Sequence, residues 1–174
     1  MKQDNSQELF PVVDEEGNIV GSATRGECHS GRKLLHPVVH LHVFNANGEL
    51  YLQKRPAWKD IQPGKWDTAV GGHVDWGESV MQALRREASE ELNLSGFKPH
   101  AVARYVFESS RERELVFTFL AEAGGDILQP SSELDVGRFW SIDEIRSSMG
   151  KGIFTPNFEG EIERVLDVRR KSRS

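Results

Sequence analysis

Three glutamates that lie close together in one expected helix are the residues of this sequence best suited to chemistry. Glu87, Glu90 and Glu91 all fall in the stretch LRREASEEL. At about 100° per residue, Glu90 and Glu91 lie roughly 60° and 40° to either side of Glu87, so all three project from one helix face. Like charges at this spacing repel, and Mg²⁺ resolves the repulsion because it binds carboxylate oxygens together with substrate phosphates. The cluster therefore predicts divalent-metal chemistry on a phosphate compound, and a solvated helix face with Arg85 and Arg86 as counter-ions is the alternative.

These acids belong to a longer pattern that runs from residue 72 to residue 94. The segment resembles the Nudix box, G-x5-E-x7-R-E-U-x-E-E-x-G-U, in which U is a bulky aliphatic residue. The positions in register are Gly72, Glu78, Arg86, Glu87, Glu90 and Glu91. Two positions depart from the pattern. Ala88 stands at a bulky-aliphatic position, and Asn93 replaces the last glycine, where Asn tolerates the left-handed conformation that ends a helix.

The resemblance implies a metal-dependent hydrolase of a nucleoside diphosphate linked to another group, or of a related organic diphosphate. It implies that Glu87, Glu90 and Glu91 bind Mg²⁺ or Mn²⁺, with the Gly71 carbonyl as a further ligand. It also gives Gly72, Glu78 and Arg86 a structural role, the last two through a charge-assisted contact. In the expected reaction, water attacks a phosphorus atom of the diphosphate and a carboxylate takes the proton.

A second resemblance covers roughly residues 10 to 120 and is to type 1 isopentenyl diphosphate isomerases, themselves members of the Nudix superfamily. It implies a second metal site, for Zn²⁺ or Mn²⁺, because imidazole and carboxylate ligands together suit such ions. The ligands of this site would be His29, His36, His73, Glu112 and Glu114. Glu114 is also a candidate catalytic residue, beside Glu90 and Glu91. The cations that would grip the diphosphate are Arg25, Arg55 and Lys59.

Two departures separate this chain from the isomerases. Gly71 stands where that family has a catalytic cysteine, and Glu87 stands where its helix carries arginine. Glycine has no group that transfers a proton to or from carbon, so we rank hydrolysis first. Isomerisation by a replacement acid and a non-catalytic metal- or nucleotide-binding module are the alternatives. His40 and His42 match no pattern and are interpreted as structural.

The elements expected to position these residues mix strands and helices. Helical spacing joins Met81, Leu84, Ala88 and Leu92, and Ser141 begins a short helix. A last amphipathic helix is expected around residues 158–166, with a frayed tail RRKSRS. Strands are expected around the turn at residues 14–18 and at 38–44, 50–54, 101–107, 115–121 and 136–140, with a loop at 56–68. This order favours an α+β fold, specifically a Nudix-like α/β/α sandwich with a mixed β-sheet.

The length, net charge and cysteine content of the whole chain exclude further functional classes. Its 174 residues predict a single Nudix domain, 1–174, with N-terminal strands in about residues 1–30 and the box at 72–94. The net charge of −5 argues against nucleic-acid and membrane-surface partners, and Cys28, the sole cysteine, cannot form an intrachain disulfide. No signal peptide or membrane span is evident. We therefore expect a cytoplasmic enzyme with a small-molecule diphosphate substrate, and the N-terminal strands could serve as a homodimer surface.

Overall fold

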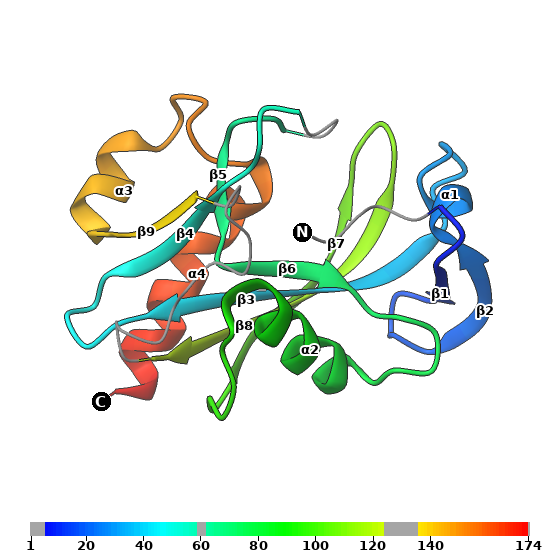
Figure 1. Ribbon diagram of the computed structural model, residues 1–174, viewed down its shortest axis with the longest axis horizontal. Coiled ribbons are helices and arrows are strands. Elements are labelled where there is room, and N and C mark those ends of the chain that lie inside the picture. Colours follow the sequence, from blue (N-terminus) through cyan, green and yellow to red (C-terminus); the bar gives the residue numbers. More distant parts are fainter. Residues whose placement is uncertain (1–5, 59–61, 124–135, 174) are drawn as a thin grey trace.

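The computed structural model describes residues 6–58, 62–123 and 136–173 (Figure 1). Its helices are α1 (Arg25–Cys28), α2 (Val80–Leu92), α3 (Ile142–Ser148) and α4 (Pro156–Ser172). Its strands are β1 (Leu9–Val13), β2 (Ile19–Thr24), β3 (Leu35–Phe44), β4 (Leu50–Lys54), β5 (Trp66–Thr68), β6 (Val70–His73), β7 (His100–Glu108), β8 (Arg113–Glu122) and β9 (Val136–Trp140). The expected α+β fold with a mixed sheet is confirmed.

A seven-stranded mixed sheet forms the centre of the molecule, beside a separate β1–β2 hairpin. The main strand order is β5-β4-β3-β8-β7, with β6 paired to β3 and β9 paired to β4. β3 and β8 are parallel along their full length, from Leu35 opposite Arg113 to Phe44 opposite Glu122. The pairs of β3 with β6 and of β8 with β7 are antiparallel. The long β3 strand therefore joins the box region to β7 and β8.

The two faces of β3 differ in chemistry, because successive side chains on a strand point to opposite sides. Val39, Leu41 and Val43 belong to the apolar core that also contains the buried face of α2. The alternate positions include His36, His40 and His42, and the last two of these contact a buried carboxylate on α4. The side chains of β3 that face α2 are therefore mainly apolar, whereas those that face α4 are partly polar.

Helix α2 begins and ends at residues suited to those positions. The Ser79 hydroxyl accepts from the Gln82 amide while the Gln82 side chain accepts from the Ser79 amide, which together form a capping box. At the other end, Asn93 is left-handed with φ 53° and ψ 30°, which is the conformation expected of it from the sequence. These two ends fix the helix register and with it the directions of the three box glutamates.

Several sequence expectations differ from the structure. β5 lies in the segment expected to be a loop and β6 was not expected, because both are short strands defined by their partners β4 and β3 rather than by alternation. Met81 is 38% exposed, and Ala83 takes the inward position on α2 instead. The tail does not fray at residue 169: α4 continues to Ser172, and Arg169 and Arg173 both bind Glu122.

Candidate active site

Arg86 joins the loop of the box to its helix. Its Nε donates to Glu78 Oε2 at 2.7 Å and its Nη2 donates to Glu78 Oε1 at 2.8 Å, a bidentate pair. Nη2 also donates to the His73 carbonyl at 3.0 Å, and Nη1 donates to Glu87 Oε1 at 2.7 Å. The two residues expected to brace the box are thus in direct contact, and the same guanidinium binds the first of the three acids.

The three box acids occupy three different environments. Glu87 is buried, and its carboxylate lies so close to Gly72 that a Cβ there would be 2.2 Å from Glu87 Cδ. Glu90 is exposed, with Oε2 3.4 Å from Arg86 Nη1. Glu91 accepts a hydrogen bond of 3.1 Å from the Gly71 amide. The acids therefore follow the seam between α2 and β6, from the interior out to solvent.

Three histidines and one glutamate gather at the other end of β6. His29 caps the C-terminus of α1, His36 lies on β3, His73 ends β6 and Glu112 precedes β8. One ligand atom from each lies within 4.8 Å of all the others. His29 Nε2 is 2.9 Å from Glu112 Oε2, and His36 Nε2 is 3.9 Å from the same oxygen. Four of the five ligands implied for the second metal site are thus brought together.

The chemistry of this group fits a divalent cation. His36 Nδ1 lies 2.8 Å from the Leu34 carbonyl, which can only accept, so Nδ1 carries the proton and Nε2 offers its lone pair. That Nε2 is buried, and no described residue forms a hydrogen bond with it. Burial lowers the pKa of His36, which keeps the ring neutral. Burial alone would raise the pKa of Glu112, but His29, His36 and Arg25 hold it below its ordinary value, so the group is a carboxylate.

The other expected site residues that the structure describes are not part of this group of four. Glu114 is opposite His36 in the β3–β8 register, yet it is not part of the group of four ligands found among the described residues. Burial, together with the Glu112 charge, raises the pKa of Glu114 to about 8. Arg55 Nη1 lies 3.5 Å from Asp67 Oδ2, and Arg25 Nη1 lies 3.5 Å from Glu8 Oε2. Lys59 lies outside the described residues. The Gly71 carbonyl as a metal ligand stays a prediction.

The NUDIX domain family matches residues 34–158, which include the whole box and the strands around it. The chain belongs to the Nudix family. It is 32% identical over 152 residues to an uncharacterized Nudix hydrolase of Yersinia pestis, covering 86% of this chain and 81% of the relative. It is also 29% identical over 122 residues to an isopentenyl-diphosphate Delta-isomerase of Serratia proteamaculans, covering 70% of this chain and 60% of the isomerase. Both resemblances inferred from the sequence are therefore confirmed.

Solved structures share this Nudix fold. A Deinococcus radiodurans protein superposes with a TM-score of 0.74 at 23% identity, covering 90% of this chain and 98% of that one. A second, from Methanosarcina mazei, gives 0.67 at 24% identity, with 80% and 98% covered. In the described part of the chain, no helix is both long and apolar enough to cross a bilayer.

A buried carboxylate on α4 adds a feature that the sequence did not reveal. Glu161 is only 4% exposed, and its Oε1 is 2.8 Å from His42 Nε2. Its Oε2 is 2.7 Å from His40 Nδ1 and also accepts from the Tyr105 hydroxyl. Burial alone would lower the pKa of His40, but the Glu161 carboxylate outweighs burial and raises it to about 9. The alternation of His40 and His42 was visible in the sequence, but nothing there paired it with a residue on the last helix.

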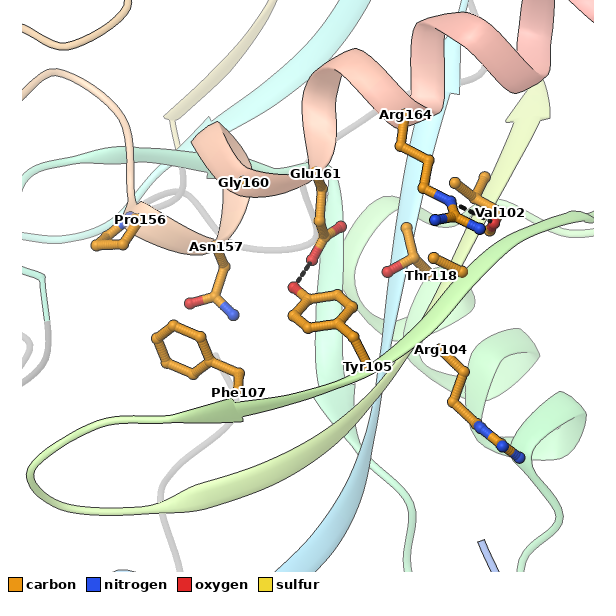
Figure 2. Close-up of a pocket in the computed structure, with 11 residues that line it drawn as sticks. Val102, Arg104, Tyr105, Phe107, Thr118, Pro156, Asn157, Gly160, Glu161 and Arg164 are labelled. Carbon is orange, nitrogen blue, oxygen red and sulfur yellow. Dashed lines mark hydrogen bonds between the residues drawn. The ribbon is translucent and has the colours of Figure 1, made fainter. Parts of the chain in front are cut away.

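Glu161 also borders a pocket of about 420 Å³ between β7, β8 and α4 (Figure 2). Figure 2 shows the Tyr105 hydroxyl pointing at Glu161, with Phe107 and Asn157 beside it. Thr118 and Asn157 also line the pocket, and the buried Thr118 hydroxyl has no hydrogen-bond partner among the described residues. In this Nudix domain the pocket therefore combines aromatic walls with polar groups that a ligand could satisfy.

Proposed function

We propose that this Nudix protein is a divalent-metal-dependent hydrolase that cleaves the diphosphate linkage of a nucleoside diphosphate derivative or a related organic diphosphate. The observation that supports it most is the arrangement of the box. Arg86 holds Glu78 and Glu87 at 2.7 Å each, and Glu91 receives the amide of Gly71. These contacts hold the acids of the box against β6, the strand that contains Gly71.

Two sets of residues would hold the metal ions. Glu87, Glu90 and Glu91 present the oxygen ligands that Mg²⁺ or Mn²⁺ prefers, and His29, His36, His73 and Glu112, joined by Glu114, present the mixed set that suits Zn²⁺ or Mn²⁺. When bound, such ions offset the charge of the diphosphate and of the developing transition state. The buried Nε2 of His36, which forms no hydrogen bond within the described part of the chain, supports the second site.

The protein's own groups supply the remaining steps. Arg25, Arg55 and Lys59 bind the diphosphate oxygens and keep the two phosphates oriented. A water oxygen forms the new bond to phosphorus, and a carboxylate of the site, one of Glu90, Glu91 and Glu114, accepts its proton. The bridging P–O bond breaks, and the departing phosphate leaves with that electron pair. The organic group attached to the diphosphate would occupy the pocket of Figure 2.

Isomerisation is the second candidate. The His29–His36–His73–Glu112 group favours it, because the isomerase resemblance implies a metal site that contains these four residues. Against it, Gly71 offers no side chain at the position of the catalytic cysteine, and Glu87 stands where the isomerases carry arginine. We therefore rank hydrolysis first. The single-domain organisation, a cytoplasmic location and a homodimer through the N-terminal strands remain predictions.

The test is a substrate panel with purified protein and Mg²⁺ or Mn²⁺. The panel holds nucleoside triphosphates, ADP-ribose, nucleoside diphosphate sugars, dinucleoside polyphosphates and isopentenyl diphosphate, with products separated by chromatography. We expect metal-dependent release of a phosphate-containing product from at least one compound. Deuterium exchange at the allylic carbon of isopentenyl diphosphate, without any phosphate release across the panel, would instead identify an isomerase.

A further inference from the structure

His40 presents one ring edge to the backbone of Gly71, the residue directly before the box. It lies on β3 directly opposite Gly71 of β6 in the antiparallel register, so its side chain stands on the same face as the missing side chain of Gly71. A Cβ built at Gly71 would lie 3.6 Å from His40 Cδ2 and 4.0 Å from His40 Nε2. The Nε2 edge of the ring therefore borders the space that the absent Gly71 side chain leaves open.

The opposite edge of the ring is fixed by Glu161. His40 Nδ1 is 2.7 Å from Glu161 Oε2, and the same carboxylate binds His42 and the Tyr105 hydroxyl. With three donors already on its two oxygens, the buried Glu161 has little capacity left for a ligand. Its effect on a ligand is indirect: it holds the ring in one rotamer, with a proton on Nδ1.

Several residues near the His40 ring have proposed roles in binding metal or substrate. On one side, the Gly71 amide binds Glu91 of the box at 3.1 Å. Asp67 and Glu114 lie close enough to act on the charge of His40, and Arg55, a proposed diphosphate ligand, contacts Asp67 at 3.5 Å. The bare backbone at Gly71 thus lies between the box acid Glu91 and the His40 ring, and it leaves space that a larger side chain would fill.

We propose that His40 is a substrate-contacting residue, which donates a hydrogen bond from Nε2 to a phosphate oxygen of the diphosphate, and that Glu161 is the residue that positions it. This inference rests on the proposed function, because it assumes that a diphosphate lies along the box. The Glu161 carboxylate is buried and lies 2.7 Å from Nδ1, a geometry that pairs it with a positively charged ring, and such a ring carries a proton on Nε2 as well. A charged donor to phosphate is among the stronger hydrogen bonds in proteins.

A matched pair of variants separates the two edges of the ring. In His40→Asn, the amide nitrogen lies near the Nδ1 position and keeps a donor to Glu161, but nothing remains at Nε2. In His40→Gln, the amide nitrogen lies near the Nε2 position, and the contact with Glu161 is lost instead. The probe is methylenediphosphonate with Mg²⁺, a diphosphate analogue that cannot be hydrolysed, and binding is measured by calorimetry alongside thermal unfolding of each variant.

We expect His40→Asn to bind the analogue roughly 10- to 100-fold more weakly, the effect of losing one hydrogen bond to a charged group, and His40→Gln to retain much of the affinity. Equal losses in the two variants, or wild-type affinity in His40→Asn, would overturn the proposal. Should His40→Asn fail to fold, ¹⁵N-detected NMR of the wild-type histidines decides. The Nε2 signal of His40, assigned by its absence from His40→Gln, must shift when the analogue binds, and an unmoved signal rejects the contact.

The same measurements keep this inference apart from the function on which it rests. Wild-type protein that binds the analogue with the expected dependence on His40, yet cleaves no diphosphate of the panel, would refute the hydrolase and leave the contact standing. Wild-type protein that cleaves a diphosphate while His40→Asn binds and cleaves as well would refute the contact alone. Absence of both binding and cleavage in the wild type would refute both.

Discussion

Gly72 lies directly against the buried carboxylate of Glu87. A Cβ at Gly72 would meet Glu87 Cδ at 2.2 Å and both carboxylate oxygens within 2.6 Å, distances that no unbonded atoms tolerate. Gly72 does not have positive φ, so contact rather than backbone conformation excludes a side chain here. Glu87 cannot retreat easily, because its other neighbour is the Arg86 guanidinium at 2.7 Å. The close approach of β6 to α2 is therefore built on this glycine.

The first prediction compares the two adjacent glycines. Gly72→Ala must displace the Glu87 carboxylate and break its contact with Arg86, and we expect the free energy of unfolding to fall by about 2–3 kcal/mol, the scale of overpacking combined with a disturbed ion pair. Gly71→Ala is the matched control, since the nearest atom to its Cβ among the described residues is His40 Cδ2 at 3.6 Å. Urea unfolding of both variants checks the difference, and equal stabilities would show that Glu87 moves aside without cost.

The second prediction concerns the outer acids of the box. Glu91→Gln and Glu90→Gln each remove one charge with little change of volume, and turnover should fall by ~10²-fold or more if these groups hold the catalytic cation. The control is Glu163→Gln on α4, where the side chain is 69% exposed and contacts Arg146. Steady-state kinetics on any substrate identified by the panel makes the comparison. Full activity in Glu91→Gln would show that the outer acids of the box do not hold the catalytic cation.

The third prediction concerns the histidine group. After exhaustive dialysis, elemental analysis should find tightly held Zn²⁺ or Mn²⁺, and His36→Ala should lose that ion while the protein still responds to added Mg²⁺. His100→Ala, at the start of β7 and outside the group, serves as the control. If the protein is free of metal after dialysis and equally stable, the histidine group is not a tight metal site.

The fourth prediction is a pH dependence of stability that Glu161 and His40 impose together. Burial opposes the charge on Glu161, but His40 and His42 outweigh it and hold the Glu161 pKa well below the ordinary 4.5, so its contribution is present above about pH 4.5 and is lost as the pH falls. The His40 pKa rises from 6.5 to about 9, so its contribution is complete below pH 6.5 and is lost as the pH rises towards 9. The pair should therefore stabilise the fold most between about pH 4.5 and 6.5.

Glu161→Gln measures this contribution. Removing one partner of a buried ion pair typically costs about 3–5 kcal/mol, so the variant should be less stable than wild type by about that amount near pH 6. The difference should shrink towards pH 9 and towards pH 3. Urea unfolding across this range is the measurement, and a difference that does not vary with pH would mean that packing, rather than charge, makes Glu161 important.

Local sequence signals predicted the part of the site that lies on one continuous segment. The box spans a loop and α2, so its spacing sets the directions of Glu87, Glu90 and Glu91, and the left-handed stop at Asn93 follows from residue type. The histidine group was predicted only through resemblance. Its members come from the residue that follows α1, from β3 and β6, and from the turn before β8, and no periodicity joins residues so far apart in the chain.

Tertiary pairing decided what the sequence could not. β5 and β6 have 3 and 4 residues, too short for an alternation to be recognised, and their partners alone define them. The pairing of His40 and His42 with Glu161 spans 121 and 119 residues of sequence. It depends on how α4 lies across the sheet, which amphipathic spacing in α4 predicts only as a face and not as a position along β3.

The Glu161 contacts fix how α4 can sit on the sheet. An apolar stripe such as Phe158, Ile162 and Val165 tolerates sliding and small rotations, because hydrophobic burial has no direction. A shift of α4 by one residue would turn Glu161 by about 100° and carry it about 1.5 Å along the axis. It would then leave two histidines and a tyrosine facing hydrocarbon. The buried carboxylate therefore fixes a single register of α4 on the sheet, and that register determines the shape of the adjacent pocket.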